Sequence, residues 1–368
     1  MARLAVIVEQ LLAPVPGGTG RYTAEIAAAL AATAPAASTV AGWAAWHRAL
    51  GAAVPGVRGP RRLPLPRRGL VAAWERGLGP VPRDADVVHA PTPLAPPRRG
   101  VPLVVTIHDA VPWTHPWTLT PRGVAWHRRA GQRAARTADR VVVPTAAVAD
   151  ELSRVLPDLR ADRLLVVGEG ATAALASPPP DAAARADRLR LPPAYLLSLA
   201  TLEPRKGLDV LLAAVAEPAA PDLPLLVVGQ PGWGGVDPAT EAARRGLPPG
   251  RVRVLGRLAD PDLAVVLHRA AGVVVPSRAE GFGLPVLEAM AAGVPVVSSD
   301  APALVEVGGG ATLVVRRDDP PALATALRAI VEDRELAARL SAAGRRRAGD
   351  FNWQAAARAL WLAYDDLS

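Results

Sequence analysis

Cysteine is absent from the 368 residues, so the chain can form neither disulfide bridges nor thiolate metal sites. No apolar run approaches the length of about eighteen residues that a membrane-spanning helix needs. The apolar stretch at residues 4–8 is too short for a signal peptide, and Glu9 interrupts it. We therefore expect a cytoplasmic protein that meets the inner membrane face only by peripheral contact, if at all.

Lysine and aromatic residues are also scarce. Lys206 is the only lysine among 42 basic residues, which suggests that this position needs an ammonium group. Aromatic residues make up 4% of the chain, and none stands between the arginines of the densest basic segment, residues 58–68. Because binding of single-stranded nucleic acid relies on aromatic stacking, we expect no nucleic-acid partner.

The positive charge is concentrated in the first half of the chain. The formal net charge is +8, but residues 1–190 contain 24 arginines against 14 acidic residues. Arg58, Arg61, Arg62, Arg67 and Arg68 alternate with prolines and leucines, and we interpret this segment as a basic loop. An anionic acceptor, an anionic membrane face or a simple solubility bias would each account for the charge.

Strand-like and helix-like segments alternate along the chain, which predicts an α/β protein with a mostly parallel sheet in each half. The expected strands are residues 4–8, 87–89, 103–107, 140–143, 164–167, 195–199, 225–228, 252–255, 273–275, 294–298 and 312–315. Proline-rich stretches near residues 177–180 and 191–193 suggest an interdomain linker. We expect an N-terminal domain over residues 1–185, a C-terminal domain over 186–347 and a final helical segment over 348–368.

Two carboxylates, Glu280 and Glu288, stand eight positions apart on either side of a glycine-containing loop that leads into a helix. The connecting residues are Gly281, Phe282, Gly283, Leu284 and Pro285. An apolar β-branched run precedes the loop, so it should lie at the carboxyl end of a strand, where parallel sheets bind ligands. A helix N-terminus attracts phosphate, and carboxylates accept hydrogen bonds from sugar hydroxyls. The pattern predicts a sugar-nucleotide site.

A second polar element, residues 201–207, also follows a strand and precedes a helix. It places Arg205 and Lys206 at the carboxyl edge of the second sheet. Cations at a helix N-terminus oppose the helix dipole unless an anion is present, and here they can neutralise a diphosphate leaving group.

The string from Glu280 to Glu288, together with the Glu-Ala-Met-Ala-Ala-Gly-Val-Pro-Val-Val run at residues 288–297, resembles the signature of the retaining family-four glycosyltransferases of the GT-B fold. The resemblance covers nearly the whole chain. It implies two Rossmann-like, doubly wound domains facing a central cleft, with the last helix crossing back onto the N-terminal domain. It also implies transfer from a nucleotide-sugar donor with retention, no metal, and no cofactor beyond that donor substrate.

The resemblance assigns roles to the residues of the C-terminal half. Lys206, helped by Arg205, would hold the donor diphosphate. Glu280 would bind a donor-sugar hydroxyl and Glu288 the nucleotide ribose, while the helix start at Leu284 and Pro285 would contact phosphate. The turn at Arg257 and Leu258 would lie near the nucleobase.

In the N-terminal half, the glycine loop of residues 13–20 resembles the family's N-terminal loop. Backbone at Gly17 and Gly18 could approach the donor closely because glycine has no Cβ atom. His108 ends a strand, and a matching histidine in the family lies near the donor sugar. Asp84 and Asp86 form an Asp-x-Asp pair, but they precede a strand and should lie at the opposite end of the sheet, so we expect no metal there.

Several functions remain open from the sequence. The resemblance favours a hexosyltransferase using GDP-mannose, with UDP- and TDP-sugars open, and a glycan, lipid-linked or small-molecule acceptor. A phosphorylase or sugar-phosphate synthase on the same fold would use similar carboxylates. A non-catalytic sugar-nucleotide sensor or a basic membrane-surface adaptor is a different class of function, because fold alone does not decide activity.

Overall fold

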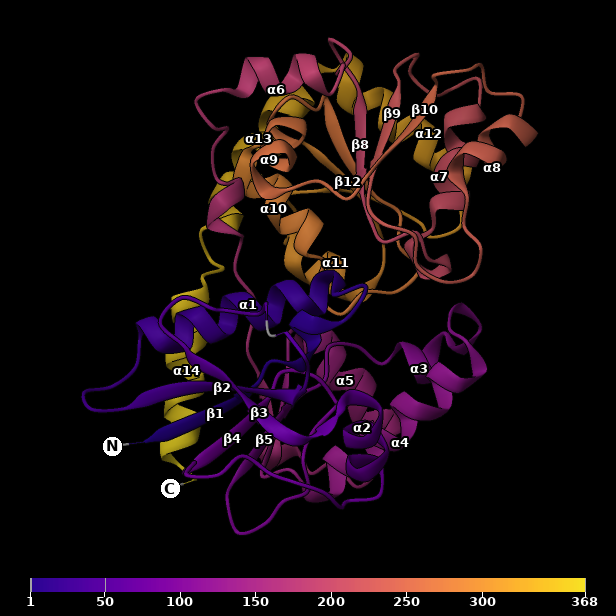
Figure 1. Ribbon diagram of the computed structural model, residues 1–368. Helices are drawn as coiled ribbons and strands as arrows, with labels where there is room; N and C mark the ends of the chain where they lie inside the picture. The colour runs from indigo at the N-terminus through magenta and orange to yellow at the C-terminus, as the bar shows by residue number, and fades with distance from the viewer. Residues whose placement is uncertain (1, 50, 368) are drawn as a thin grey trace. The chain divides into compact units, whose positions relative to one another are not determined.

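A computed structural model describes residues 2–49 and 51–367 of the chain, which divide into two compact units (Figure 1). The first unit comprises residues 1–116, 121–169 and 352–368, and the second comprises residues 117–120 and 170–351. The division differs from the expected domain boundaries, since residues 170–185 and 348–351 belong to the second unit.

The first unit is built on a seven-stranded parallel sheet in the order β3-β2-β1-β4-β5-β6-β7. Its strands are β1 (Arg3–Ile7), β2 (Thr39–Trp46), β3 (Arg58–Pro66), β4 (Val87–Ala90), β5 (Leu103–Thr106), β6 (Arg140–Val143) and β7 (Leu164–Val166). The central strands β4 and β5 are buried throughout and mostly apolar, as expected for parallel strands covered on both faces. The strand order reverses between β1 and β4, which is where doubly wound sheets bind ligands.

Helices connect these strands. They are η1 (Glu9–Leu12), α1 (Gly17–Ala32), α2 (Arg67–Glu75), α3 (Val111–Thr114), α4 (Pro121–Thr137), α5 (Ala146–Val155) and η3 (Ala161–Arg163). The last helix of the chain, α14 (Trp353–Asp365), also belongs to this unit, whereas η2 (Pro116–Thr118) begins in the first unit and ends in the second. Trp74, Leu70 and Leu152 are among the fully buried side chains that pack these helices on the sheet.

The C-terminal helix α14 belongs to the first unit, although the second unit precedes it in the chain. It lies beside α1 (Figure 1), where the Trp361 indole nitrogen donates to the Leu30 carbonyl at 3.1 Å. The Tyr364 hydroxyl lies 2.6 Å from Nδ1 of the buried His89 on β4. The apolar face of α14 therefore packs on the first unit, and the polar atoms of the buried Trp361 and Tyr364 side chains lie within hydrogen-bond distance of partners in that unit.

The second unit is built on a six-stranded parallel sheet in the order β10-β9-β8-β11-β12-β13. Its strands are β8 (Leu196–Leu199), β9 (Leu225–Val228), β10 (Val252–Gly256), β11 (Gly272–Val275), β12 (Val296–Ser299) and β13 (Leu313–Val315). Its helices are η4 (Ala173–Leu175), α6 (Ala182–Arg188), η5 (Pro204–Lys206), α7 (Leu208–Ala216), α8 (Pro238–Arg244), α9 (Asp260–His268), α10 (Leu284–Ala292), α11 (Pro302–Gly308), α12 (Pro320–Glu332) and α13 (Arg334–Ala348). The strand order reverses between β8 and β11.

Two expectations for the first unit were wrong. The segment interpreted as a basic loop is strand β3 followed by the start of α2. The prolines are tolerated because, among the residues that the structure describes, β3 lies at the edge of the sheet and pairs with β2 alone. Helix α1 already begins at Gly17, so Gly17 and Gly18 form its first turn rather than a free loop. Strand β2 was not predicted, since its alanines and glycine have low strand propensity.

Candidate active site

The carboxyl ends of β8 and β11 carry the residues that the sequence singled out in the second unit. After β8, the short helix η5 presents Arg205 and Lys206. After β11, residues 276–283 form a loop that contains Glu280 and leads into α10. Because β8 and β11 are neighbours at the point where the strand order reverses, the two segments meet.

Glu280 is the centre of this meeting point. Lys206 Nζ donates to its Oε1 at 2.6 Å, Arg205 Nη1 donates to its Oε2 at 3.0 Å, and Ser277 Oγ donates to Oε1 at 2.7 Å. The Glu280 side chain is 6% exposed. Burial raises its pKa, but Lys206 and Arg205 together outweigh burial and lower the pKa to about 2. Glu280 is therefore an ionised hydrogen-bond acceptor at neutral pH.

Arg205 also contacts a second buried acid. Its Nε lies 2.7 Å from Glu203 Oε1, and the Glu203 side chain is 3% exposed. The cluster thus contains two cations and two carboxylates, which balances charge in a site partly removed from water. Sequence reasoning missed Glu203, although it precedes the Pro-Arg-Lys element directly.

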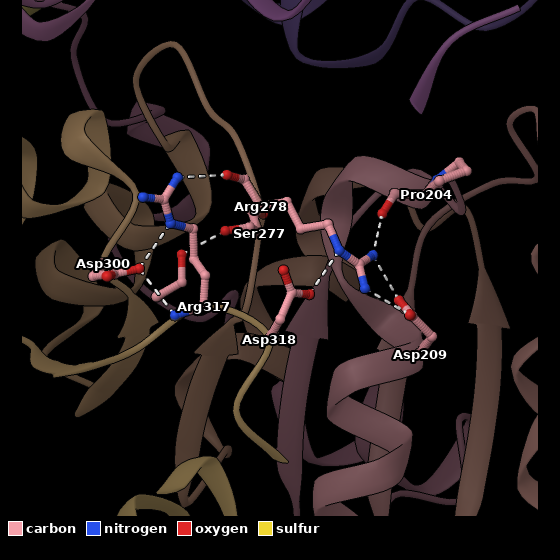
Figure 2. Close-up of polar contacts among 8 residues, drawn as sticks. Pro204, Asp209, Ser277, Arg278, Asp300, Arg317 and Asp318 are labelled. Carbon is pink, nitrogen blue, oxygen red and sulfur yellow. Dashed lines mark hydrogen bonds and ion pairs between the residues drawn. The ribbon is translucent and has the colours of Figure 1, made fainter. Parts of the chain in front are cut away.

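Arg278 fastens the Glu280 loop to η5, as Figure 2 shows. Its guanidinium makes a bidentate pair with Asp209, at 2.9 and 2.7 Å, and donates to the Pro204 carbonyl at 2.9 Å. Its Nε donates to Asp318 at 2.7 Å, and its backbone N–H donates to the Arg205 carbonyl at 2.8 Å. The cation pair and the carboxylate are therefore held in one geometry by a residue that sequence reasoning passed over.

A second arginine supports the same loop from the neighbouring strands (Figure 2). Arg317, after β13, donates to the Arg278 carbonyl at 3.1 Å and pairs with Asp300 at 2.8 Å. The Ser299 hydroxyl at the end of β12 donates to the Ser277 carbonyl. Backbone carbonyls of the loop are thereby satisfied, which favours a single conformation.

Glu288 lies in the second turn of α10 and is 5% exposed. The Thr172 hydroxyl donates to its Oε1 at 3.0 Å. The preceding Gly283 has φ of 99°, and a Cβ there would collide with the Leu304 side chain, so the sharp turn into α10 requires glycine. Pro285 lies in the first turn, at the helix start that the sequence predicted, and Gly293 ends the helix with φ of 71°.

Other predicted residues of the second unit lie apart from this cluster. Phe282 is buried and meets the Phe351 ring edge-on at 5.4 Å, so its side chain serves packing. Arg257 and Leu258 follow β10, the edge strand, which β9 separates from β8. The structure thus brings Glu280, Arg205 and Lys206 into contact. It does not bring Arg257 and Leu258 to this cluster, so their assignment to the nucleobase is supported only by the family resemblance.

His108 follows β5 in the first unit. Its Nε2 donates to the Pro91 carbonyl at 2.8 Å, its Nδ1 lies 3.7 Å from Glu169 Oε1, and the Tyr22 ring packs edge-on at 4.6 Å. The imidazole orientation is therefore fixed, with Nδ1 facing a carboxylate. Gly18 has open space where a Cβ would stand.

Asp86 lies at the amino end of β4, as expected. Its carboxylate accepts from the Arg3 backbone N–H at 2.7 Å and pairs with the Arg3 guanidinium at 2.7 Å. These contacts lower the pKa of Asp86, chiefly through the Arg3 side chain. The carboxylate is engaged in joining β4 to β1 at the edge opposite the strand carboxyl ends.

Family models match both halves of the chain. A model described as glycosyl transferases group 1 matches residues 180–347, and one described as glycosyltransferase family 4 matches residues 16–173. A D-inositol 3-phosphate glycosyltransferase of Catenulispora acidiphila is 34% identical over 82% of this chain and 76% of its own length. The chain belongs to glycosyltransferase family 4.

Further relatives of this family-4 glycosyltransferase differ in the length they share with it. The O-antigen chain mannosyltransferase B of Escherichia coli is 38% identical over 44% of this chain, and a D-inositol 3-phosphate glycosyltransferase of Rhodococcus jostii is 36% identical over 74%. The chain spans 42% and 62% of these two relatives' lengths.

Solved structures establish the GT-B fold for this family-4 glycosyltransferase. A sucrose-phosphate synthase from Thermosynechococcus elongatus superposes with a TM-score of 0.79 at 24% identity, covering 100% of this chain and 99% of the other. Anabaena HepE in complex with UDP-glucose superposes with a TM-score of 0.77 at 20% identity and covers 100% of both chains. Within residues 2–49 and 51–367, no helix is long and apolar enough to cross a membrane.

Proposed function

We propose that this protein transfers a hexose from a nucleotide-sugar donor to an acceptor hydroxyl with retention at the anomeric carbon. The observation that carries the proposal is the buried, ionised Glu280 between Lys206 and Arg205 at the carboxyl edge of the second sheet. An ionised carboxylate accepts hydrogen bonds from hydroxyl groups, and a fixed cation pair stabilises a departing diphosphate. One cluster therefore supplies both groups that sugar transfer from a nucleotide requires.

In the proposed reaction, the bond between the anomeric carbon and the diphosphate oxygen breaks. The acceptor oxygen forms its bond on the same face, and the acceptor's proton passes to the departing phosphate oxygen. Lys206 and Arg205 stabilise the charge that develops on the diphosphate, while Glu280 holds a donor-sugar hydroxyl. Glu288 binds the nucleotide ribose, and His108 contacts the donor sugar. No step requires a metal or a cofactor.

The donor that we favour carries GDP and mannose. The E. coli relative named as a mannosyltransferase supports the sugar, whereas the Anabaena complex with UDP-glucose keeps UDP-sugars among the candidates. The acceptor is a glycan, a lipid-linked molecule or a small molecule, and the basic first unit is proposed to bring the protein into peripheral contact with anionic membrane. We place the enzyme in the cytoplasm.

A screen of nucleotide sugars by thermal unfolding tests the donor. A ligand at about 100 times its dissociation constant stabilises the protein by roughly 2.7 kcal/mol, which is readily measured. Product analysis of the best donor with and without EDTA then tests retention and metal independence together. Loss of turnover in EDTA with recovery in magnesium would refute the metal-free mechanism.

A further inference from the structure

A second polar cluster lies in the first unit at the carboxyl end of β1, next to the point where the strand order reverses. Its centre is Glu9, whose side chain is 1% exposed. Glu9 Oε2 accepts from the Ala45 backbone N–H at 2.8 Å, and His47 Nε2 lies 3.0 and 3.1 Å from the two carboxylate oxygens. Arg67 Nε lies 3.5 Å from Glu9 Oε1. The buried Glu9 carboxylate thus contacts His47, which follows β2, and Arg67, which begins α2.

Glu9 fixes the imidazole of His47 in a particular orientation. Because Nε2 faces both carboxylate oxygens, it carries the proton, and the opposite nitrogen, Nδ1, is directed away from Glu9. Nδ1 has no hydrogen-bond partner among residues 2–49 and 51–367, and the His47 side chain is 23% exposed. The ring therefore offers an oriented polar atom to a ligand.

Arg67 is held in a comparable way. Only its Nε approaches Glu9, and its two terminal nitrogens make no hydrogen bond to any residue that the structure describes. Arg67 and Arg68 open α2, a nine-residue helix with no acidic residue in its first turn. Two cations at a helix N-terminus oppose the helix dipole, and an anion at this place would relieve that repulsion.

We propose that Arg67 and His47, oriented by Glu9, bind a phosphate group of the acceptor. This inference rests on the proposed function, since it names the acceptor chemistry of that reaction. Phosphate suits the terminal guanidinium nitrogens, which donate in a planar fork, and the P–OH of a singly protonated phosphate group donates to His47 Nδ1. Within the basic segment of residues 58–68, Arg67 is held by Glu9 and recognises the phosphate group. The other arginines of the segment contribute only a general electrostatic attraction for anions.

Calorimetry with the full-length protein, loaded with nucleoside diphosphate, tests the proposal. The probes are myo-inositol 1-phosphate against myo-inositol, and phosphatidylinositol vesicles against phosphatidylcholine vesicles. We expect the anionic probes, myo-inositol 1-phosphate and phosphatidylinositol, to bind in preference to neutral myo-inositol and zwitterionic phosphatidylcholine. Preference for the soluble probe indicates a small-molecule acceptor, and preference confined to vesicles indicates a lipid headgroup; both support a phosphate site.

Matched variants separate this site from general positive charge. Arg67→Gln should weaken the phosphorylated probe by about 10- to 100-fold, the effect of losing a charged hydrogen bond, and Arg67→Lys should recover part of it. Arg68→Gln removes the same charge one residue away and should weaken binding by only about 2-fold, because Glu9 orients Arg67 and the exposed Arg68 side chain supplies general attraction alone. His47→Gln tests the imidazole independently.

Donor binding distinguishes failure of this inference from failure of the proposed function. If nucleoside diphosphate binds normally but the wild type shows no preference for phosphate, or if Arg67→Gln and Arg68→Gln weaken binding equally, the Glu9 cluster is structural and the inference is overturned. If no nucleotide binds at all, the proposed function itself fails. An unchanged thermal midpoint in Arg67→Gln verifies that the variant is folded.

Discussion

The buried charge of Glu280 leads to a quantitative prediction about pH and stability. Its pKa in the folded protein is about 2, against an ordinary value of 4.5 for a glutamate side chain. A depressed carboxylate pKa contributes stability that is present above the unfolded value and is lost as pH falls through the folded value. The shift corresponds to about 3 kcal/mol at pH 7, and about 2 kcal/mol of that should be lost between pH 7 and pH 3.

Glu280→Gln removes the titrating carboxylate while preserving the size of the side chain. The difference in unfolding free energy between the wild type and this variant therefore isolates the contribution of the Glu280 charge. Urea unfolding at pH 3, 5 and 7, read by proteolysis of the second unit, measures this difference without assuming that both units unfold together. The control is Glu335→Gln in the first turn of α13, where the carboxylate is 85% exposed and pairs with Arg339. The difference in unfolding free energy between the wild type and Glu335→Gln should stay below about 0.5 kcal/mol at every pH. A pH-independent difference for Glu280→Gln would refute the reasoning.

Four variants, with Arg251→Lys as a control, test the roles of individual side chains in the second unit. Lys206→Ala should lower turnover at saturating donor by about 10² to 10³ with the fold intact, and unchanged turnover would remove Lys206 from the mechanism. Glu280→Gln should weaken nucleotide-sugar binding more than nucleoside diphosphate binding, whereas Glu288→Gln should weaken both; calorimetry showing equal losses for Glu280→Gln would contradict the division of roles. Arg278→Lys should lower kcat by about tenfold, since an ammonium cannot replace the planar fork. Arg251→Lys, a control that pairs with Asp222, should keep wild-type kcat.

The sequence predicted most of the second unit because its signals are local. Strands such as β9 and β11 are short apolar runs, and α7 and α10 begin directly after the two polar elements that the sequence placed before helices. The family signature lies in one continuous string that ends a strand and starts a helix. Fold class and the identity of the candidate donor residues could therefore be predicted from the chain alone.

Strand β3 shows where local signals fail. Its prolines and arginines favour a loop, yet pairing with β2 at the sheet edge makes it a strand. The same limit applies to Glu9, which the sequence presents only as an interruption of an apolar run. Its partners, His47 and Arg67, come from later segments, so only the folded sheet brings the three together.

The sequence by itself determined which residue types stand at the carboxyl ends of strands, because strand periodicity and glycine positions are local properties. Only the tertiary structure decided which of these residues meet. Glu280 and Lys206 lie 74 positions apart, and Arg278 and Asp209 lie 69 apart. They come together because β8 and β11 are neighbours in the sheet, an order set by how the crossover helices pack rather than by any single segment.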